Sequence, residues 1–283
     1  MKKGLIMEGG AMRGMFTAGV IDVMMEHGIV LDGAIGVSAG AAFGCNYKSG
    51  QIGRVIRYNT RFASDKRYGG FRVLLKTGNY YSKEFCYEEV PNKYDPFDYD
   101  AFQKNPMEFY VVCTDVDTGK AEYHKYEGRH DYGLEWIRAS ASMPLVSEMV
   151  QIGDRKFLDG AMADSIPVKF FESIGYDRNV VILTQPLGFQ KKKDSLLPLM
   201  KLRYRKYPQL LNAIITRDQQ YNETLEYIRS REEAGELLVI RPAEKLPIER
   251  TEKDPAVLRQ VYETGRQVAQ MRMEEIRKFF EQV

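Results

Sequence analysis

Two glycine-rich turns within the first fifty residues constrain the fold more than any other feature. Each follows a short apolar run, at residues 3–8 and 29–37, and the turns begin at Gly9 and Gly36. Between the runs, apolar residues recur at steps of three and four over residues 16–27, which is typical of a helix, and small residues from Ala41 begin another. Strand, helix and strand units in one sheet are parallel and right-handed in nearly all known cases. We therefore expect the two turns to be neighbours at one edge of a sheet.

The remainder of the chain predicts an α/β fold with a helical end. Further strands are expected at residues 109–116, 121–126, 180–183 and in a hairpin over 148–157. After Pro186 the pattern changes to long polar helical stretches at 196–206, 208–234 and 255–281, with one strand at 236–240. We predict a mostly parallel central sheet flanked by helices within an α/β core at residues 1–185, followed by a mainly helical C-terminal extension at 186–283.

Composition excludes several classes of protein and partner. The chain has 283 residues and is 44% hydrophobic, so a disordered or collagen-like chain is excluded. Its 41 Lys and Arg nearly cancel 39 Asp and Glu, so we expect no nucleic-acid partner. The cysteines, Cys45, Cys86 and Cys113, are widely spaced and form no Cys-x-x-Cys pair, and we expect no metal and no cofactor. Without a signal-peptide core or a long apolar window, we expect a cytoplasmic protein.

The turn over residues 36–40 has the pattern of a nucleophile elbow. Gly36 and Gly40 flank Ser38 in a Gly-x-Ser-x-Gly motif between a predicted strand and a predicted helix. Small flanking residues let the strand turn sharply into the helix and leave the serine hydroxyl at the apex. Such five-residue matches are common, and the alternative is a glycine-rich turn with an incidental serine.

The earlier turn is a candidate oxyanion-binding loop. A glycine-rich loop beside a nucleophile presents backbone N–H groups, and losing one such donor typically costs about 10²- to 10³-fold in rate. The candidate residues of this loop are Gly9, Gly10, Ala11, Arg13 and Gly14. The main alternative is a dinucleotide fingerprint, but alanine occupies its second glycine position and the acidic residue expected roughly 20 positions later is absent.

A serine nucleophile needs a base to take its proton. Of the three histidines, His27 falls on the apolar face of the first predicted helix, His124 in a strand and His130 in a polar loop, so each favours a structural or solvated role. We therefore predict that a carboxylate acts on the serine directly, and Asp159, followed by Gly160 and an alanine, is the best placed. On composition alone, its rivals are Asp115, Asp117 and Asp164.

In this order, the three motifs resemble those of the patatin-like phospholipase family, over roughly residues 3–185. The segment 138–144 also resembles a small-residue segment of the family. The resemblance implies a patatin-like fold and an acyl-ester hydrolase of phospholipase A or lysophospholipase type. It further implies Ser38 as nucleophile, Asp159 as general base and the Gly9–Gly14 loop as oxyanion hole, with no metal.

The chain departs from the family pattern at two positions of the loop. Glu8 replaces the usual aspartate and Ala11 replaces the third glycine. If that position requires a left-handed backbone, a residue other than glycine costs about 1 to 2 kcal/mol. Arg13 matches the family's basic position, and the alternative for it is a solvated surface arginine.

The segment 189–206 is the one strongly charged stretch outside these motifs. It holds seven Lys or Arg residues against one Asp, with leucines between them. A basic amphipathic helix of this kind is a candidate for peripheral contact with an anionic membrane, and the alternative is a solvated helix whose leucines pack on the core.

Three functions stay open: a lipolytic acyl hydrolase, a serine esterase for soluble esters and a non-catalytic lipid-binding module. The presence of both Ser38 and Asp159 argues against the last.

Overall fold

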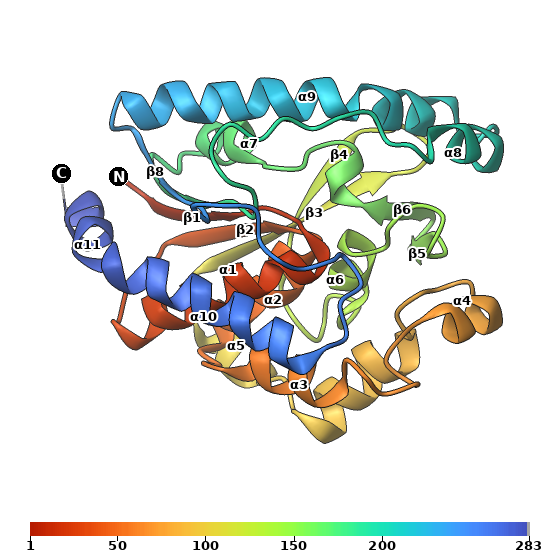
Figure 1. The fold of residues 1–283 in the computed structure, drawn as a ribbon, viewed down its shortest axis with the longest axis horizontal. Helices are drawn as coiled ribbons and strands as arrows, with labels where there is room; N and C mark the ends of the chain where they lie inside the picture. The colour runs from red at the N-terminus through yellow and green to blue at the C-terminus, as the bar shows by residue number, and fades with distance from the viewer. Residues whose placement is uncertain (282–283) are drawn as a thin grey trace.

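The computed structural model describes residues 1–281, which form a sheet of eight strands between two layers of helices (Figure 1). The strand order is β5-β6-β3-β2-β1-β7-β8, and β4 pairs with β3. The strands are β1 (Lys3–Met7), β2 (Gly33–Val37), β3 (Glu108–Asp115), β4 (Ala121–Lys125), β5 (Val150–Ile152), β6 (Arg155–Asp159), β7 (Arg178–Ile182) and β8 (Leu237–Ile240). All strand pairs among β3, β2, β1, β7 and β8 are parallel, whereas β4, β5 and β6 pair in the antiparallel sense. The predicted α/β fold with a mostly parallel central sheet is confirmed.

Helices cover both faces of this sheet. One layer is formed by α1 (Gly14–Glu26), α2 (Ala39–Ser49), α3 (Arg54–Phe62), α5 (Tyr99–Lys104), α6 (Glu135–Ser140) and α10 (Pro255–Met271). The other is formed by α7 (Val168–Ser173), α8 (Leu197–Arg203) and α9 (Pro208–Glu233). Leu5 and Met7 of β1 belong to the first core and Ile6 to the second. Because both faces are buried, the parallel strands are continuous apolar runs, which is why the sequence revealed them.

The chain after Pro186 is mainly helical, as predicted, and it contacts the rest of the fold closely. Strand β8 pairs in parallel with β7, so it extends the same sheet, and α10 packs along α1. The helix predicted over 255–281 is divided at Arg272 into α10 and α11 (Met273–Glu281). The division of the chain into two units at residues 185 and 186 stays a prediction.

One expectation about the remaining segments is wrong. His27 does not face the core: it is exposed at the C-terminal end of α1, where its Nδ1 lies 3.2 Å from Nη2 of Arg277. Short helices fill the middle of the chain, namely α4 (Phe71–Thr77) and a π-helical segment at Glu84–Tyr94, in addition to α3 and α5. Across residues 1–281, no helix is both long enough and apolar enough to cross a bilayer.

Helices α1 and α10 pack with their backbones in close contact at two glycines, one on each helix. A Cβ atom added to Gly19 would lie 2.1 Å from the carbonyl oxygen of Tyr262, and one added to Gly265 would lie 2.1 Å from that of Phe16. Beside the crossing, the Tyr262 hydroxyl donates a hydrogen bond of 2.7 Å to the buried Asp22 carboxylate. The absence of side chains at the two glycines therefore sets the distance between the helices.

We predict that Gly265→Ala destabilises the protein even though alanine favours helix more than glycine. The added methyl group must separate α10 from α1, and overpacking of this kind typically costs about 1 to 3 kcal/mol. The free energy of unfolding in urea measures the effect. Gln267→Ala, an exposed change on the same helix, is the matched control and should change the stability by less than about 0.5 kcal/mol. Equal stability of Gly265→Ala and the control would contradict the described contact.

Candidate active site

Ser38 sits at a strained turn between β2 and α2. Its φ of 55° and ψ of −121° lie outside the regions that residues other than glycine ordinarily adopt. The neighbouring glycines make the turn possible, because a Cβ on Gly40 would lie 2.3 Å from the carbonyl oxygen of Met7 and one on Gly36 would lie 2.4 Å from that of Gly40. The motif therefore has the strand-to-helix geometry that the sequence predicted.

A second serine secures this turn. The backbone N–H of Ser38 donates to Oγ of Ser140 at 2.8 Å, and the Ser140 hydroxyl donates to the carbonyl oxygen of Val112 at 2.6 Å. Ser140, fully buried at the end of α6, thus ties the elbow to β3. The sequence marked the segment 138–144 as family-like but offered no reason to choose this hydroxyl.

The glycine-rich loop after β1 lies directly against the elbow. A Cβ on Gly9 would lie 3.0 Å from Cβ of Ser38, and one on Gly14 would lie 2.9 Å from Cβ of Ala39. Gly10 lies next to the chain just after β7, where an added Cβ would lie 2.8 Å from Oγ1 of Thr184. The expectation that the two turns are neighbours is therefore confirmed.

The backbone of the loop is strained at Ala11, the position where the chain lacks the third glycine. Its φ is 49°, in the left-handed region, which costs an alanine about 1 to 2 kcal/mol. The N–H groups of Arg13 and Gly14 donate to carbonyls within the loop. Within residues 1–281, the N–H groups of Gly9, Gly10 and Ala11 have no hydrogen-bond partner. Of the five loop residues, these three are the free donors beside Ser38.

Asp159 reaches Ser38 because two strands follow one another along the same edge of β3. Strand β2 pairs with β3 up to Val37 opposite Val112, and β6 pairs with the next residue, Cys113, through Asp159. Cys113 pairs with β4 as well, so β6 must lie on the other edge of β3, which is the edge that β2 occupies. The ends of β2 and β6 therefore meet, with Ser38 just beyond one and Asp159 at the other.

The Asp159 carboxyl group is buried next to cations and to the serine. Only 3% of the residue is exposed, and Oδ1 accepts a hydrogen bond of 2.9 Å from the Ala161 N–H. Burial raises the pKa of Asp159, although the Ala161 N–H, the Arg217 charge and the Ser38 side chain lower it. The next residue must be small, because a Cβ on Gly160 would lie 2.2 Å from the carbonyl oxygen of Val112.

The rival aspartates have other partners. Asp115 accepts hydrogen bonds from Thr118 and forms an ion pair with Arg155 at 2.9 Å. Asp164 accepts a hydrogen bond from the Tyr123 hydroxyl, and Asp117 is exposed in a turn. None of the three lines the pocket that holds Ser38 and Asp159.

The histidines lie away from this pocket as well. His124 binds Asp131 at 2.5 Å and stacks on Trp136, and His130 is exposed. Of the four carboxylates weighed as a base for Ser38, the structure brings only Asp159 to the serine. Residues 1–281 contain no cluster of three or more His, Cys, Asp or Glu side chains suited to a metal ion.

Glu8, the residue that stands in place of the family's aspartate, is buried and fully engaged. Its Oε2 accepts hydrogen bonds from the N–H and hydroxyl of Thr184 at 2.6 and 3.1 Å, and its Oε1 accepts one from the Tyr221 hydroxyl at 2.5 Å. Tyr221 belongs to α9, more than two hundred residues away in sequence. Sequence patterns carry no signal for a contact of this range, so both partners were missed.

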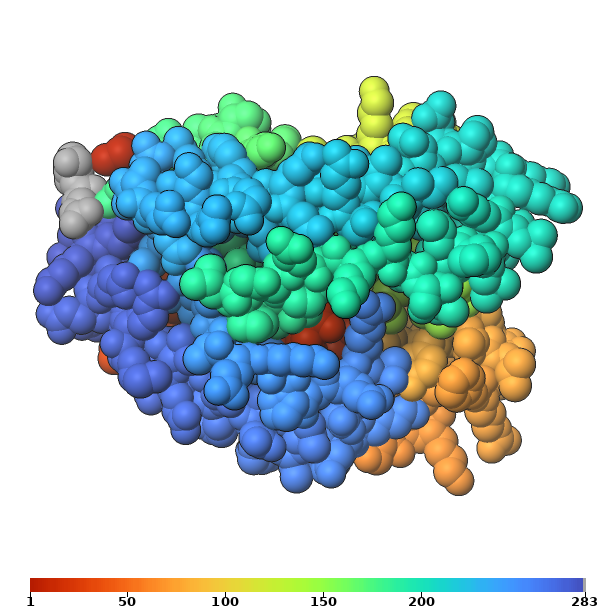
Figure 2. Space-filling model, turned by 45° about the horizontal axis from the view of Figure 1, so that its top comes forward, coloured from red at the N-terminus to blue at the C-terminus, as the bar shows by residue number. Residues whose placement is uncertain are grey.

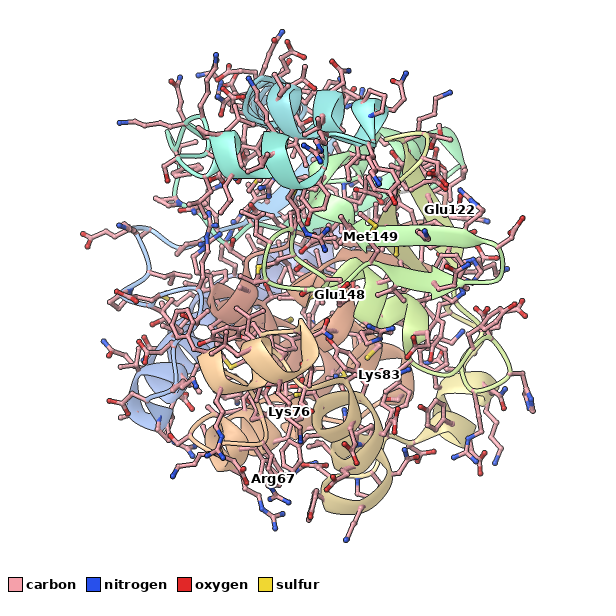
Figure 3. All side chains as sticks on the ribbon, turned by 90° about the vertical axis from the view of Figure 1, so that its right-hand side faces the viewer. Arg67, Lys76, Lys83, Glu122, Glu148 and Met149 are labelled. Carbon is pink, nitrogen blue, oxygen red and sulfur yellow. The ribbon has the colours of Figure 1, made fainter. Side chains whose placement is uncertain are left out.

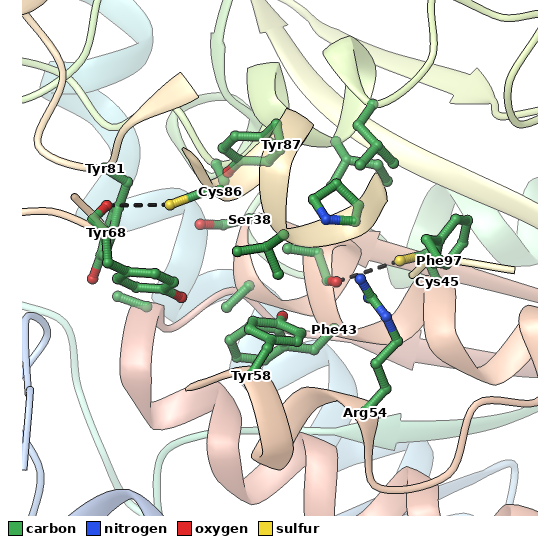
Figure 4. A pocket seen from close by; sticks show the side chains of 18 of the residues that line it. Ser38, Phe43, Cys45, Arg54, Tyr58, Tyr68, Tyr81, Cys86, Tyr87 and Phe97 are labelled. Atoms are coloured by element: carbon green, nitrogen blue, oxygen red, sulfur yellow. Dashed lines mark hydrogen bonds between the residues drawn. The ribbon is translucent and has the colours of Figure 1, made fainter. Parts of the chain in front are cut away.

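Ser38 also lines an apolar pocket enclosed by the aromatic middle of the chain (Figure 4). The walls include Phe43, Tyr58, Tyr68, Tyr81, Tyr87 and Phe97. The one arginine among the lining residues, Arg54, is buried and bound to Asn46 and to Asp95. The sequence motifs gave no indication of this pocket.

The sequence matches the models of two protein families. A family model described as "Patatin-like phospholipase" matches residues 5–171, and one described as "Domain of unknown function (DUF6363)" matches residues 207–281. The chain is 29% identical over 201 residues to "Uncharacterized protein YjjU" of Escherichia coli (strain K12), covering 64% of this chain and 52% of that protein.

More distant similarities extend to eukaryotic proteins and to a solved structure. The chain is 28% identical over 191 residues to "Lysophospholipase nte1" of Emericella nidulans, covering 62% of this chain and 11% of that protein. It therefore spans about half of the first relative and about a tenth of the second. VipD from Legionella pneumophila superposes with a TM-score of 0.44 at 12% identity, covering 95% of this chain and 67% of that one.

The family match spans more than half of the 283 residues and contains Ser38, Asp159 and the glycine-rich loop. The resemblance inferred from the three sequence motifs is thus confirmed: the chain belongs to the patatin-like phospholipase family.

Proposed function

We propose that the protein hydrolyses acyl esters of lipids, with Ser38 as nucleophile and Asp159 as general base. The observation that best supports this proposal is the meeting of β2 and β6 on one edge of β3, which brings the two side chains together beside a loop with free N–H groups. The apolar pocket that ends at Ser38 favours a substrate with a hydrocarbon chain.

In the first half of the reaction, Asp159 accepts the hydroxyl proton as Oγ of Ser38 attacks the ester carbonyl carbon. The carbonyl oxygen becomes negatively charged, and the N–H groups of Gly9, Gly10 and Ala11 are the proposed donors that stabilise it, together with the N-terminal end of α2. When the carbon–oxygen bond to the alcohol breaks, Asp159 returns the proton to the departing alkoxide. The acyl group is then esterified to Ser38.

In the second half, Asp159 accepts a proton from water while the water oxygen attacks the acyl carbon. The bond to Oγ breaks, the proton passes to Ser38, and the fatty acid leaves. A raised pKa suits this role, because a base whose pKa lies closer to the working pH takes a proton more readily.

We also propose that α4 and α8 contact an anionic membrane. In α8, Met200 is buried and Leu197 packs on the core, whereas Leu199, Leu202 and the preceding Leu196 are 51%, 62% and 52% exposed. The alternative in which the leucines pack on the core therefore holds for only one of them. The remaining three lie among the cations of segment 189–206.

Helix α4 carries a similar pattern that the sequence analysis did not single out. Phe71 and Leu75, one helical turn apart, are 77% and 89% exposed, and Arg72 and Lys76 lie beside them. Both helices lie at one end of the molecule, on either side of the β5–β6 hairpin, as Figures 1 and 3 show from two directions. Leu196 and Met200 also line the pocket that holds Ser38, so this end of the protein would place the site at the lipid surface.

We predict that a fluorophosphonate probe labels the protein at Ser38 and that Ser38→Ala abolishes the labelling. The probe requires a hydroxyl activated by a neighbouring base, as the proposed dyad provides. Intact-mass spectrometry with peptide mapping measures the adduct. Ser142→Ala, which removes a nearby buried serine outside the pocket, is the matched control. Equal labelling of the Ser38→Ala protein would overturn the nucleophile assignment.

We predict that Asp159→Asn folds normally but hydrolyses p-nitrophenyl esters about 10²- to 10⁴-fold more slowly. The amide keeps an oxygen for the Ala161 N–H but cannot take a proton. Because burial raises the pKa of Asp159, kcat/KM of the unmodified enzyme should fall as the pH decreases, with a midpoint above the usual aspartate range. Turnover by Asp159→Asn at the unmodified rate would remove the carboxylate from the mechanism.

We predict that replacing Leu199, Leu202, Phe71 and Leu75 together by serine reduces binding to vesicles of phosphatidylcholine and phosphatidylserine by about tenfold or more, because large apolar groups no longer enter the interface. Co-sedimentation measures the bound fraction. Val30→Ser removes a similarly exposed apolar residue from the turn between α1 and β2, outside α4 and α8, and should leave binding unchanged. Binding by the unmodified protein that is absent, or indifferent to salt and to phosphatidylserine, would contradict the proposal.

A further inference from the structure

We infer that Arg13, Lys191, Arg217 and Arg250 form a binding site for a phosphate or similar oxyanion carried by the alcohol part of the ester. Three of the four come from the C-terminal region, to which the family motifs assign no role. The inference rests on the proposed ester hydrolysis at Ser38 and assigns the residues that hold the anionic group of the substrate.

These four cations line one pocket together with Ser38 and Asp159. Lys191 follows β7, Arg217 lies on α9, Arg250 precedes α10 and Arg13 belongs to the glycine-rich loop. Figure 2 shows the corresponding crevice, in which red atoms of the N-terminal part of the chain lie at the bottom, between the green-to-teal segment after β7 and the blue segment before α10. The C-terminal region thus builds the walls of a pocket whose base is the proposed catalytic site.

Three of the cations make contacts that leave their charges without a carboxylate partner. Nε of Arg217 donates to the carbonyl oxygen of Ala161 at 2.6 Å, next to the Asp159 motif. The backbone of Lys191 is bound on both sides by Asn222, at 2.8 and 3.0 Å, and its Nζ lies 4.8 Å from the centre of the Tyr221 ring. The carbonyl oxygen of Arg250 accepts a hydrogen bond of 3.4 Å from the Met12 N–H.

Across residues 1–281, none of the four forms an ion pair with a carboxylate. Nε of Arg13 is buried with no hydrogen-bond partner. The pocket contains three carboxylates, but Glu8 is bound by Tyr221 and Thr184, Asp159 accepts from Ala161, and Asp194 accepts from the Leu196 N–H. The guanidinium and ammonium groups therefore retain unused donors that face a common space.

Burial and the neighbouring cations both disfavour the positive charge of Lys191. Burial, together with the neighbouring charges of Arg217 and Arg250, lowers the pKa of Lys191 to about 8. Gathering like charges in a partly desolvated crevice is unfavourable unless an anion binds there. Guanidinium groups in such clusters match the geometry of phosphate and carboxylate oxygens.

The position of Ser38 indicates which part of the substrate carries the anion. Ser38, Ala11 and Met143 line both the apolar pocket and the cationic pocket, so the two meet at the nucleophile. An ester bound with its carbonyl carbon at Ser38 and its acyl chain in the apolar pocket directs its alcohol into the cationic one. The four cations are therefore placed to hold an anionic group on the alcohol, while the acyl chain lies in the aromatic pocket.

The test compares two esters that differ only in the anion. We expect kcat/KM for 1-decanoylglycerol-3-phosphate to exceed that for 1-decanoylglycerol, both measured below their critical micelle concentrations. In the double variant Lys191→Gln and Arg250→Gln, the ratio of the two values should fall by about tenfold or more, because charged hydrogen bonds to the phosphate are lost. Lys192→Gln, an exposed neighbour that does not line the pocket, is the matched control and should keep the ratio of the unmodified enzyme.

A binding experiment separates this inference from the proposed catalysis. The Ser38→Ala protein is titrated by calorimetry with 1-O-decylglycerol-3-phosphate, 1-O-decylglycerol and inorganic phosphate. We expect the phosphorylated ether to bind about tenfold or more tightly than either of the others, and the preference to disappear in the Lys191→Gln, Arg250→Gln background. Equal affinity for the two ethers overturns the inference, and inorganic phosphate binding as tightly as the phosphorylated ether overturns its assignment to an ester headgroup. Failure of a fluorophosphonate to label Ser38 in the unmodified protein would instead overturn the proposed hydrolysis and leave this binding result interpretable.

Discussion

The site depends on the sharing of one edge of β3 by two strands of opposite direction. Strand β2 occupies that edge up to Val112, and β6 occupies it from Cys113 onward. Because the strands approach end to end, the residues at their junction are brought together by main-chain pairing rather than by the flexible loops of an open surface. Ser140 reinforces the junction by bonding Ser38 to the carbonyl of Val112. The spacing between Ser38 and Asp159 is thus a property of the sheet.

Close backbone approaches make this junction sensitive to small changes. The elbow passes so near to β1 that Gly40 has no room for a Cβ beside Met7, and Gly160 has none beside Val112. Ser38 and Ala11 both adopt positive φ angles that other structure must stabilise. The surrounding strands and helices supply that stabilisation, since Ser38 is tied to Ser140 and the loop is bonded to the chain near Arg250.

The C-terminal region is connected to the site through polar contacts as well as through the sheet. Tyr221 bonds to Glu8 at the start of the glycine-rich loop, and Arg217 bonds to the carbonyl of Ala161 just after Asp159. Glu8 departs from the family's usual aspartate, and its carboxylate is the group that Tyr221 and Thr184 bind. The region that gives the chain its long helices therefore also shapes the crevice above the nucleophile and supplies three of its four cations.

The sequence alone was sufficient for the alternation of strands and helices, the strand-to-helix turn at Ser38 and the glycine-rich loop, because these depend on local patterns of apolar and small residues. The choice of Asp159 as base stays a prediction, and it is strand register that brings Asp159 rather than its rivals to Ser38. The sequence could not reveal Ser140, Tyr221, Thr184 or the gathering of Arg13, Lys191, Arg217 and Arg250, and it placed His27 on a buried face. Those features depend on strand register and on helices that return to the site from distant parts of the chain. Local periodicity describes which face of an element is apolar, whereas only the packed tertiary structure decides which distant side chains share a pocket.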